Sequence, residues 1–399
     1  MKYSLLSILL LSVFACSVKQ SESSQVDSDY IIIDLDEKQE SSVPLSTYFK
    51  SVQTIILETK EECLIGHVSE LQVFDGYIYI LDMSISKSLF VFDTNGHFIR
   101  KIGSLGNGPG EYKQLNDFTL DPENGFIFLL DFGKNVHKYH FDGTFVKTIT
   151  PELINTRINN IQFYKNKLYM SVDAFQPAPD DNMLLEVDSD NGAILSGTLP
   201  LEYNKGWGKP FSTSHSFFMS RLSDPPRYTR LFMDNIVTIG ENITPYIRIK
   251  GKHLATSEDL DNLQHGTPNF AANIMQFTKI WDMRDYLEND ELIIFKYRHG
   301  RQFKTVIYNK KTGTVKLVDY LNNDMIYKNN DKEGINHFFL FSDSKGAYEV
   351  MFGSMIGKQV IDFQKSIKNN EINTELDKLD QLSILESDSN PVIFYYEFK

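Results

Sequence analysis

The chain has 399 residues, 41% of them hydrophobic, with 29 Phe and 20 Tyr but only 2 Trp and 2 Cys. This composition supports a large core of β-strands and excludes a disulfide framework. The formal net charge of −13 argues against nucleic acid as a partner, because nucleic-acid binding requires a basic surface. It also disfavours general adsorption to anionic membranes, and a role in solubility accounts for it.

The N-terminus has the layout of a secretory signal. Lys2 supplies a positive charge, residues 4–14 form an apolar run too short to span a bilayer, and Ala15 precedes Cys16. The string Val13-Phe14-Ala15-Cys16 looks like a lipobox, which predicts a lipoprotein signal peptide over residues 1–15 and lipidation of Cys16. An ordinary secretory signal with an incidental cysteine is the alternative.

Residues 16–29 are polar and rich in Ser and Gln, which predicts a flexible tether. Residues 30–399 are predicted to form one domain. Ser17 rather than Asp follows the lipidated cysteine, which by resemblance to lipoprotein sorting rules favours the outer membrane. The side of the envelope that the anchor faces stays open.

A repeated phrase indicates the architecture of the domain. A Gly-aromatic-Ile-aromatic-aliphatic-Leu-Asp phrase at residues 76–82 returns at residues 125–131, a shift of 49. A second phrase, with its turn at Gly96, returns around Gly143, a shift of 47. Strand, gap, strand, tight turn and strand at this period are typical of a β-propeller blade.

The chain from residue 68 to residue 352 has room for six such periods. We therefore predict an all-β fold, a six-bladed β-propeller of four-stranded antiparallel blades. The expected blades cover residues 68–102, 118–149, 158–199, 217–249, 277–320 and 337–352. The repeat is weakest between residues 201 and 278, where strands are expected at 217–222, 231–240 and 246–249 and a helical excursion at 256–263.

The last strand, at residues 391–398, needs a partner, because an open ring would leave two sheet edges free. We expect N-terminal strands such as residues 54–57 to pair with it and close the ring. A short helical insertion is expected at residues 357–385. Truncation from Asn390 onward should then cost more stability than its length suggests.

A Gly-rich string lies between the first two predicted blades. It reads Gly103-Ser104-Leu105-Gly106-Asn107-Gly108-Pro109-Gly110-Glu111-Tyr112. Glycine permits positive φ and Pro109 stiffens the turn, so a blade-to-blade crossover is expected. A phosphate-binding loop is the competing interpretation, but a strand rather than a helix follows and no Lys is in place.

This string, the blade phrases and the closing Ser389-Asn390-Pro391-Val392-Ile393-Phe394-Tyr395 resemble the bacterial six-bladed β-propeller lipoprotein family, akin to NHL-repeat propellers. The resemblance covers about residues 52–398. It implies the fold, secretion and lipidation, and it implies little about activity.

The irregular stretch holds the candidate ligand-binding residues, because binding groups collect on loops of a rigid scaffold. They are Trp207, Arg221, Arg227, Tyr228 and Arg230, with residues 221–230 taken as a loop. Aromatics that cap a neighbouring blade are the alternative. The pair Trp281-Asp282 is a weaker candidate, because Trp-Asp alone does not make a WD repeat.

No catalytic residue, metal site or cofactor is predicted. The nine His are scattered, and His137 and His140 should lie on opposite faces of a strand. Cys63 has acidic neighbours that should raise the pKa of its thiol, so a catalytic thiolate is not expected.

The preferred function is a non-enzymatic binding or scaffold module of the cell envelope for a glycan, peptide or protein partner. The membrane would be contacted only through the N-terminal lipid. The alternative is a lyase or hydrolase with a site in the central funnel, since propellers host both kinds of protein. Convergence of His, Arg and carboxylate side chains from three or more blades would favour the enzyme. A third interpretation is an assembly part without a small ligand.

Overall fold

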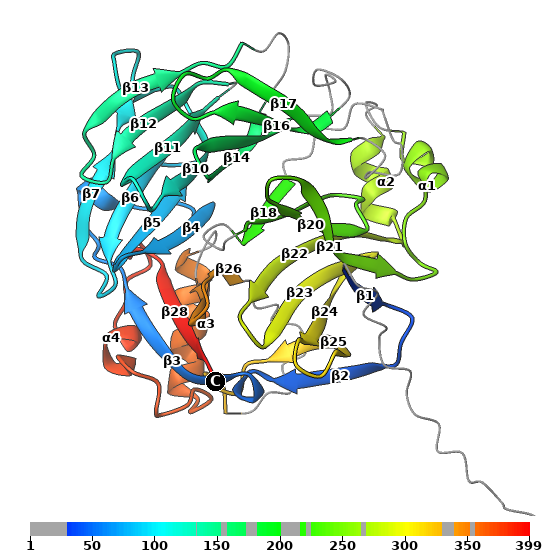
Figure 1. Cartoon of the computed structure of the whole chain (residues 1–399). Helices are drawn as coiled ribbons and strands as arrows, with labels where there is room; N and C mark the ends of the chain where they lie inside the picture. Colours follow the sequence, from blue (N-terminus) through cyan, green and yellow to red (C-terminus); the bar gives the residue numbers. More distant parts are fainter. Residues whose placement is uncertain are drawn as a thin grey trace, which may run out of the picture.

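The computed structural model describes residues 30–132, 134–152, 158–172, 182–200, 216–220, 225–264, 269–328, 339–351 and 356–399. Within these residues the chain forms six blades arranged in a ring, each built on four antiparallel strands (Figure 1). The predicted six-bladed β-propeller is therefore confirmed.

Blades 1 to 3 follow one another along the chain. Blade 1 comprises β4 (Glu70–Phe74), β5 (Tyr77–Asp82), β6 (Ser88–Asp93) and β7 (Phe98–Ile102). The Gly-rich crossover contains a short parallel pair, β8 (Ser104–Leu105) and β9 (Glu111–Tyr112). Blade 2 comprises β10 (Leu115–Asp121), β11 (Phe126–Asp131), β12 (Val136–His140) and β13 (Phe145–Ile149). Blade 3 comprises β14 (Ile158–Tyr164), β15 (Lys167–Val172), β16 (Asn182–Asp188) and β17 (Ile194–Pro200).

Blades 4 to 6 carry the helices. Blade 4 comprises β18 (Ser216–Ser220), β19 (Arg227–Arg230), β20 (Asn235–Ile239) and β21 (Ile243–Lys250), and α1 (Ser257–Asn262) and α2 (Phe270–Gln276) follow it. Blade 5 comprises β22 (Ile280–Glu288), β23 (Leu292–His299), β24 (Gln302–Asn309) and β25 (Thr314–Asn322). Blade 6 comprises β26 (Phe339–Ser342), β27 (Gly346–Met351), β28 (Val392–Phe398) and β3 (Phe49–Ile56), with α3 (Ile356–Lys368) and α4 (Leu379–Ser383) between β27 and β28. Among the described helices, none is long and apolar enough to cross a membrane.

The expected ring closure is confirmed. Strand β3 pairs antiparallel with β28, from Phe49 opposite Phe398 to Ile56 opposite Val392. Figure 1 shows the blue N-terminal strand beside the red C-terminal one. The buried Asn390 reinforces the closure, because its side chain accepts from the N–H of Ile65 (2.8 Å) and donates to the carbonyl of Cys63 (2.9 Å).

The N-terminal segment does more than close the ring. Strand β1 (Ile31–Asp34) adds to blade 4 in parallel with β21, and β2 (Gln39–Pro44) adds to blade 5 in parallel with β25. A 3-10 turn (Leu45–Thr47) then leads into β3. Blades 4 and 5 are therefore five-stranded rather than four-stranded, and residues 31–56 cover the outer edges of three successive blades.

The core lies between the blades rather than inside any one of them. On β5, Ile78 and Ile80 pack toward blade 6, whereas Tyr79 and Leu81 pack toward blade 2. The same division repeats at every junction around the ring. Because both faces of a blade are buried, its strands read as continuous apolar runs.

Tight turns fall where the Gly-containing pairs predicted them. Gly76 and Gly96 have φ of 78° and 94°, a region that favours glycine. A Cβ on Gly96 would also lie 2.1 Å from the carbonyl oxygen of Ile56. This turn of blade 1 therefore packs against the strand that closes the ring.

Three boundaries predicted from the sequence are wrong. The strand expected at residues 231–240 begins at Asn235, because Leu231 and Phe232 turn into a small apolar cluster with Trp281 instead of continuing a ladder. Residues 227–230, expected in a loop, form β19. The first strand of blade 5 begins at Ile280 rather than at residue 277.

Candidate functional site

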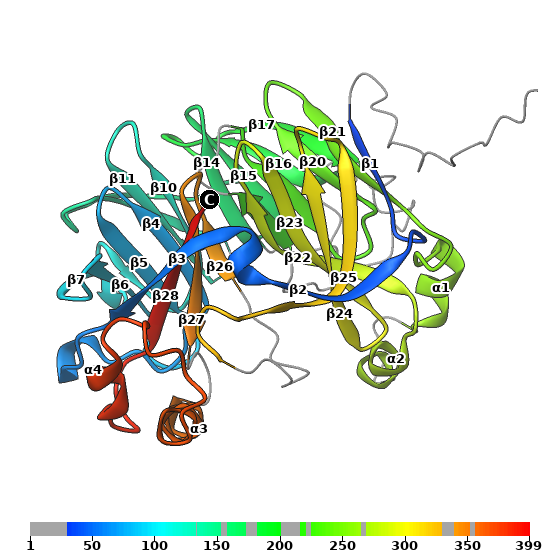
Figure 2. The ribbon, with the colours of Figure 1, turned by 90° about the horizontal axis from the view of Figure 1, so that it is seen from below.

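The two ends of the propeller are unlike. One end, here called the turn face, holds short turns at residues 75–76, 94–97, 122–125, 141–144, 165–166, 189–193, 240–242, 289–291, 310–313 and 343–345. The other end, the loop face, holds the crossovers at 57–69, 103–114, 251–264 and 269–279 and the insertion at 356–391. Figure 2 shows the four described helices gathered at this end.

The inner strands of blades 1 to 3 are tied together by buried polar side chains. Asp117 Oδ2 accepts from the N–H of Ile161 (2.7 Å) and Thr119 Oγ1 from the N–H of Phe163 (3.1 Å), both on the next blade. Gln72 Nε2 donates to the carbonyl of Phe118 (3.1 Å). These polar groups serve the scaffold, so they do not form the convergent cluster that the enzymatic alternative requires.

Blade 5 departs from this arrangement. In β10 the ladder is irregular between Leu115 and Asp117, and in β22 it is irregular between Ile280 and Asp282. Asp282 thus takes the position of Asp117 in the repeat. Its Oδ2 accepts from Arg284, whereas its Oδ1 is buried and has no hydrogen-bond partner among the residues that the structure describes.

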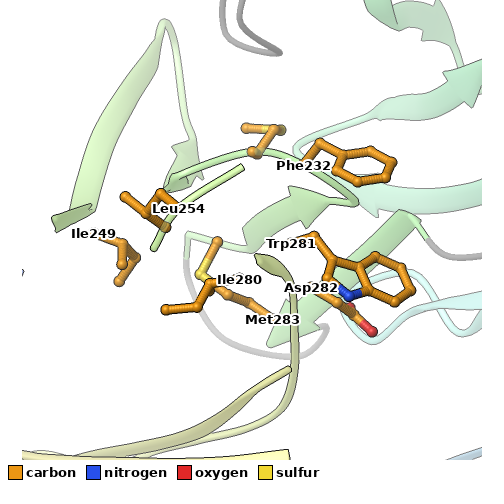
Figure 3. Close-up of a pocket in the computed structure, with 8 residues that line it drawn as sticks. Phe232, Ile249, Leu254, Ile280, Trp281, Asp282 and Met283 are labelled. Atoms are coloured by element: carbon orange, nitrogen blue, oxygen red, sulfur yellow. The ribbon is translucent and has the colours of Figure 1, made fainter. Parts of the chain in front are cut away.

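A small pocket lies beside Asp282 on the loop face. It is lined by Phe232, Met233, Ile249, Leu254, Ile280, Trp281, Asp282 and Met283. The rings of Trp281 and Phe232 stack with centroids 5.6 Å apart. The indole Nε1 of Trp281 is also buried, without a hydrogen-bond partner in the described part of the chain. Figure 3 shows Phe232, Trp281 and Asp282 at one end of the pocket and Ile249 and Leu254 at the other.

Two arginines lie near this pocket. The guanidinium of Arg298 stands over the Trp281 ring, 4.8 Å from its centroid, and that of Arg284 stands 5.0 Å from the Phe303 centroid. Burial and then the like charge of Arg284 lower the pKa of Arg298. The surroundings of Trp281 therefore carry more positive than negative charge.

The structure places only some of the predicted ligand-binding residues. Trp207 and Arg221 lie outside the described residues, as does Cys16. Tyr228 is fully buried, with its hydroxyl 2.8 Å from that of Ser171, and Arg230 is buried with Nη1 3.4 Å from the carbonyl of Val172. These two face the junction of blades 3 and 4, and the structure does not bring them together with Arg227.

Arg227 belongs to a buried ion-pair cluster near the turn face. Its Nε lies 3.2 Å from Glu288 Oε2, and its guanidinium stacks 3.6 Å from the Tyr246 ring centroid. Glu288 also accepts from Tyr246 (2.6 Å), Tyr286 (2.8 Å) and Lys310 (2.7 Å). Burial alone would lower the pKa of Arg227, but the Glu288 carboxylate raises it overall. The cluster joins blades 4 and 5.

The other candidate catalytic or metal-binding side chains do not gather into a cluster in the described part of the chain. Across the described part of the chain, no group of three or more His, Cys, Asp or Glu side chains could hold a metal ion. His137 is buried with Nε2 3.6 Å from Asp131, and burial lowers its pKa. Cys63 is a buried free thiol whose pKa is raised, mainly by burial and then by Glu58 and Glu62.

Trp281 and Asp282, a weak candidate pair in the sequence, both line the pocket in the structure. Asp282-Met283-Arg284 alternates between polar and apolar residues as Asp117-Phe118-Thr119 does in blade 2. Sequence therefore indicates an inner strand at both places. It carries no signal for the missing partner of Asp282, which depends on the neighbouring blade.

Solved structures share this fold. One, from Bacteroides fragilis and described as an exported protein, is 19% identical over 92% of this chain and 99% of that chain, with a TM-score of 0.71. Another, a member of the DUF4221 family from Bacteroides vulgatus, is 10% identical over 88% of this chain and 97% of that chain, with a TM-score of 0.53. No curated protein is similar enough in sequence to count as a relative. The model of the family described as a domain of unknown function, DUF4934, matches residues 30–397, and the chain therefore belongs to that family.

Proposed function

We propose that this protein is a lipid-anchored binding module of the cell envelope, attached through Cys16 at the outer membrane, whose loop face engages a glycan, peptide or protein partner. The observation that carries the proposal is the difference between the two faces. Short turns make up the turn face, whereas the crossovers, the helices and the Trp281 pocket lie on the loop face. Binding residues collect on loops held by a rigid scaffold.

Two further observations support this proposal. Large apolar side chains stand exposed on the loop face of blades 1 and 2, namely Leu64 (45%), Ile85 (68%) and Phe132 (54%). Exposed apolar groups beside polar ones are typical of interaction sites. In addition, a Bacteroides fragilis protein with this fold is described as exported, which agrees with the signal sequence at residues 1–15.

The test compares the faces directly. Immobilised protein comprising residues 17–399 is incubated with a detergent extract of the envelope, and the captured molecules are identified by mass spectrometry. The loop-face double variant Ile85→Lys with Phe132→Lys should lose the captured set. The turn-face double variant Thr94→Lys with Glu123→Lys, also at exposed positions, should retain it. Equal capture by both variants, or capture by neither protein nor variants, would contradict the proposal.

Anchoring is tested separately. Cys16→Ala should release the full-length protein from the membrane fraction, because the thiol that carries the lipid is absent. Unchanged membrane retention would refute the lipid anchor and leave the loop-face test unaffected.

A further inference from the structure

The outer edges of the six blades differ in what lies against them. Strands β1 and β2 cover the outer edges of blades 4 and 5, where they pair with β21 and β25. In blade 6 the insertion after β27 reaches the outer strand β3, because the N–H of Thr54 donates to Asp377 Oδ1 (2.8 Å). Blades 1 to 3 end in β7, β13 and β17, and each of these pairs only with the next strand inward. Within the residues that the structure describes, three outer edges are therefore open.

Two of these three edges carry a basic side chain. An open edge invites pairing with another chain, and Lys or Arg on the edge opposes it. The fourth residue after the turn glycine of each blade is Arg100 in β7, Lys147 in β13 and Ser196 in β17. Arg100 donates to the carbonyl of Phe141 (2.7 Å) and Lys147 forms an ion pair with Asp190, each on the turn of the next blade. Strand β17 contains no Lys, Arg, Asp or Glu, so its edge lacks this protection.

The sequence of β17 suits pairing with a second copy of itself. Leu195 is 50% exposed, and Ser196 and Gly197 are exposed as well. An antiparallel pair with its two-fold axis at Ser196 sets Leu195 of one copy opposite Gly197 of the other. Opposite residues share a face of the sheet, so the Leu195 side chain covers a residue that has none. The same pairing of β7 or β13 would set Arg100 opposite Arg100 or Lys147 opposite Lys147, which is destabilising.

We propose that β17 is a dimerisation edge, at which two copies of this chain join their third blades into one continuous antiparallel sheet. The contact is short, because Leu199 has a positive φ of 60° that bends the chain after Thr198. The net charge of −13 on each copy opposes association. The dimer is therefore weak, and it strengthens with salt, which screens this repulsion. Anchoring through Cys16 would favour it, since confinement to one membrane raises the effective concentration.

Sedimentation equilibrium of the protein comprising residues 17–399 measures the association. The average mass of wild type should rise toward twice the monomer mass with concentration, and more so at high salt. Ser196→Lys should weaken the association at least tenfold, because it sets Lys opposite Lys, and should leave the melting temperature unchanged, because Ser196 is exposed. A wild type that stays monomeric up to about millimolar concentration, or equal association of both proteins, would overturn the proposal.

A matched pair of variants tests whether blade 3 is special. Leu195 in β17 and Val146 in β13 are both the third residue after a turn glycine, and they are 50% and 39% exposed. Leu195→Lys should weaken the association, whereas Val146→Lys should leave it unchanged. Equal effects of the two variants would show that charge alone, and not the edge of β17, controls association.

Disulfide formation tests the register. Residues directly opposite in an antiparallel pair have Cα atoms about 4.5–5.5 Å apart, within the roughly 4.4–6.8 Å that a disulfide spans. Ser196→Cys should therefore give a disulfide-linked dimer on mild oxidation, and Val146→Cys should not. In residues 17–399 the single other thiol is that of the buried Cys63. Equal cross-linking of both variants would reveal random collision and contradict the proposed register.

The dimer and the loop-face function fail independently. The loop-face double variant Ile85→Lys with Phe132→Lys leaves β17 unaltered and should dimerise as wild type does. If β17 instead pairs with an extended segment of another envelope protein, Ser196→Lys lowers capture from the extract while wild type stays monomeric. That outcome would refute the dimer and leave the loop-face test unaffected.

Discussion

Asp117 in blade 2 and Asp282 in blade 5 hold the same place in the repeat and differ in what surrounds them. Each follows an irregularity in the first strand of its blade and each is buried. Asp117 binds backbone N–H groups of its own and the next blade. Asp282 binds Arg284 through one oxygen, and its other oxygen has no partner within the described ranges of the chain. The repeat thus supplies the same residue to a scaffold role in one blade and to a pocket in another.

The difference between Asp117 and Asp282 indicates where this fold leaves room for a pocket. In blades 1 to 3 the polar side chains of the inner strands bind backbone groups of the neighbouring blade. Between blades 4 and 5, the turn at Phe232 packs against the start of β22 beside the crossover that contains α1 and α2. There the regular pattern of hydrogen bonds from inner-strand side chains is interrupted. An interruption of the scaffold pattern is therefore a better guide to a site than loop composition.

The largest effect should come from breaking the scaffold at its closure. Deletion of residues 390–399 removes β28 from the middle of blade 6, including the fully buried Val392, Ile393, Phe394 and Tyr396. At about 1.5–3 kcal/mol for each buried side chain, about 6–12 kcal/mol is lost, comparable to a typical total stability of about 5–15 kcal/mol. The variant should show no cooperative thermal transition by circular dichroism.

A matched deletion provides the control. Removal of residues 30–36 takes away β1, an outer fifth strand of blade 4. That variant should still melt cooperatively. Wild-type melting of the C-terminal deletion would show that the ring does not depend on β28.

The ion-pair cluster between blades 4 and 5 should give the next largest effect. Glu288→Gln leaves the buried Arg227 without its counter-charge, which should cost about 3 kcal/mol at pH 7. Burial alone would raise the pKa of Glu288, but Arg227 and Lys310 lower it overall. A lowered pKa means that this stabilisation is present above the unfolded value of about 4.3 and is lost as the pH falls through the folded value.

Urea denaturation at pH 7, 5 and 3 measures this dependence. The difference in unfolding free energy between wild type and Glu288→Gln should be large at pH 7 and should shrink at pH 3. A difference that is constant over this range would show that the Glu288 charge contributes nothing.

The same substitution at Asp117 and at Asp282 tests whether these two residues differ in their structural role. Asp117→Asn places an amide N–H₂ against a backbone N–H, which should cost about 1–3 kcal/mol. Asp282→Asn should cost less than Asp117→Asn, because its amide oxygen can still accept from Arg284 and the oxygen replaced by N–H₂ has no hydrogen-bond partner among the described residues. Equal losses in chemical denaturation would remove the distinction between scaffold and pocket.

The smallest effect concerns the thiol of Cys63. It is fully buried and its pKa is raised, so a thiol reagent at pH 8 should not react with the folded protein comprising residues 17–399. After denaturation in urea one equivalent should react. Rapid reaction of the folded protein would mean that the segment before blade 1 opens readily.

Sequence predicted the blades well because each strand carries a strong local signal. The turns at Gly76 and Gly96 require positive φ, and the apolar runs of β5 and β11 require burial on both faces. The pairing of β28 with an N-terminal strand also followed, since an unpaired edge is unfavourable. Blade 4 was harder, because Leu231 and Phe232 have strand character and yet turn toward Trp281.

The candidate site could not be predicted in the same way. Arg227 lies in a segment that looks like a binding loop, but Glu288, 61 residues away in sequence, holds it. Asp282 looks like Asp117, and only the packing of blades 4 and 5 distinguishes them. Such partners are set by contacts between distant segments, which local pattern does not encode.

The pairing of β3 with β28 also determines when the fold can be completed during synthesis of the chain. Val392 is made more than 300 residues after Ile56, which at about 5–20 residues per second corresponds to roughly 20–70 s of synthesis. Throughout that interval β3 lacks β28, the strand with which it pairs, and the ring cannot close until β28 has been made. Premature pairing of β3 with a second chain is therefore the characteristic hazard of this architecture.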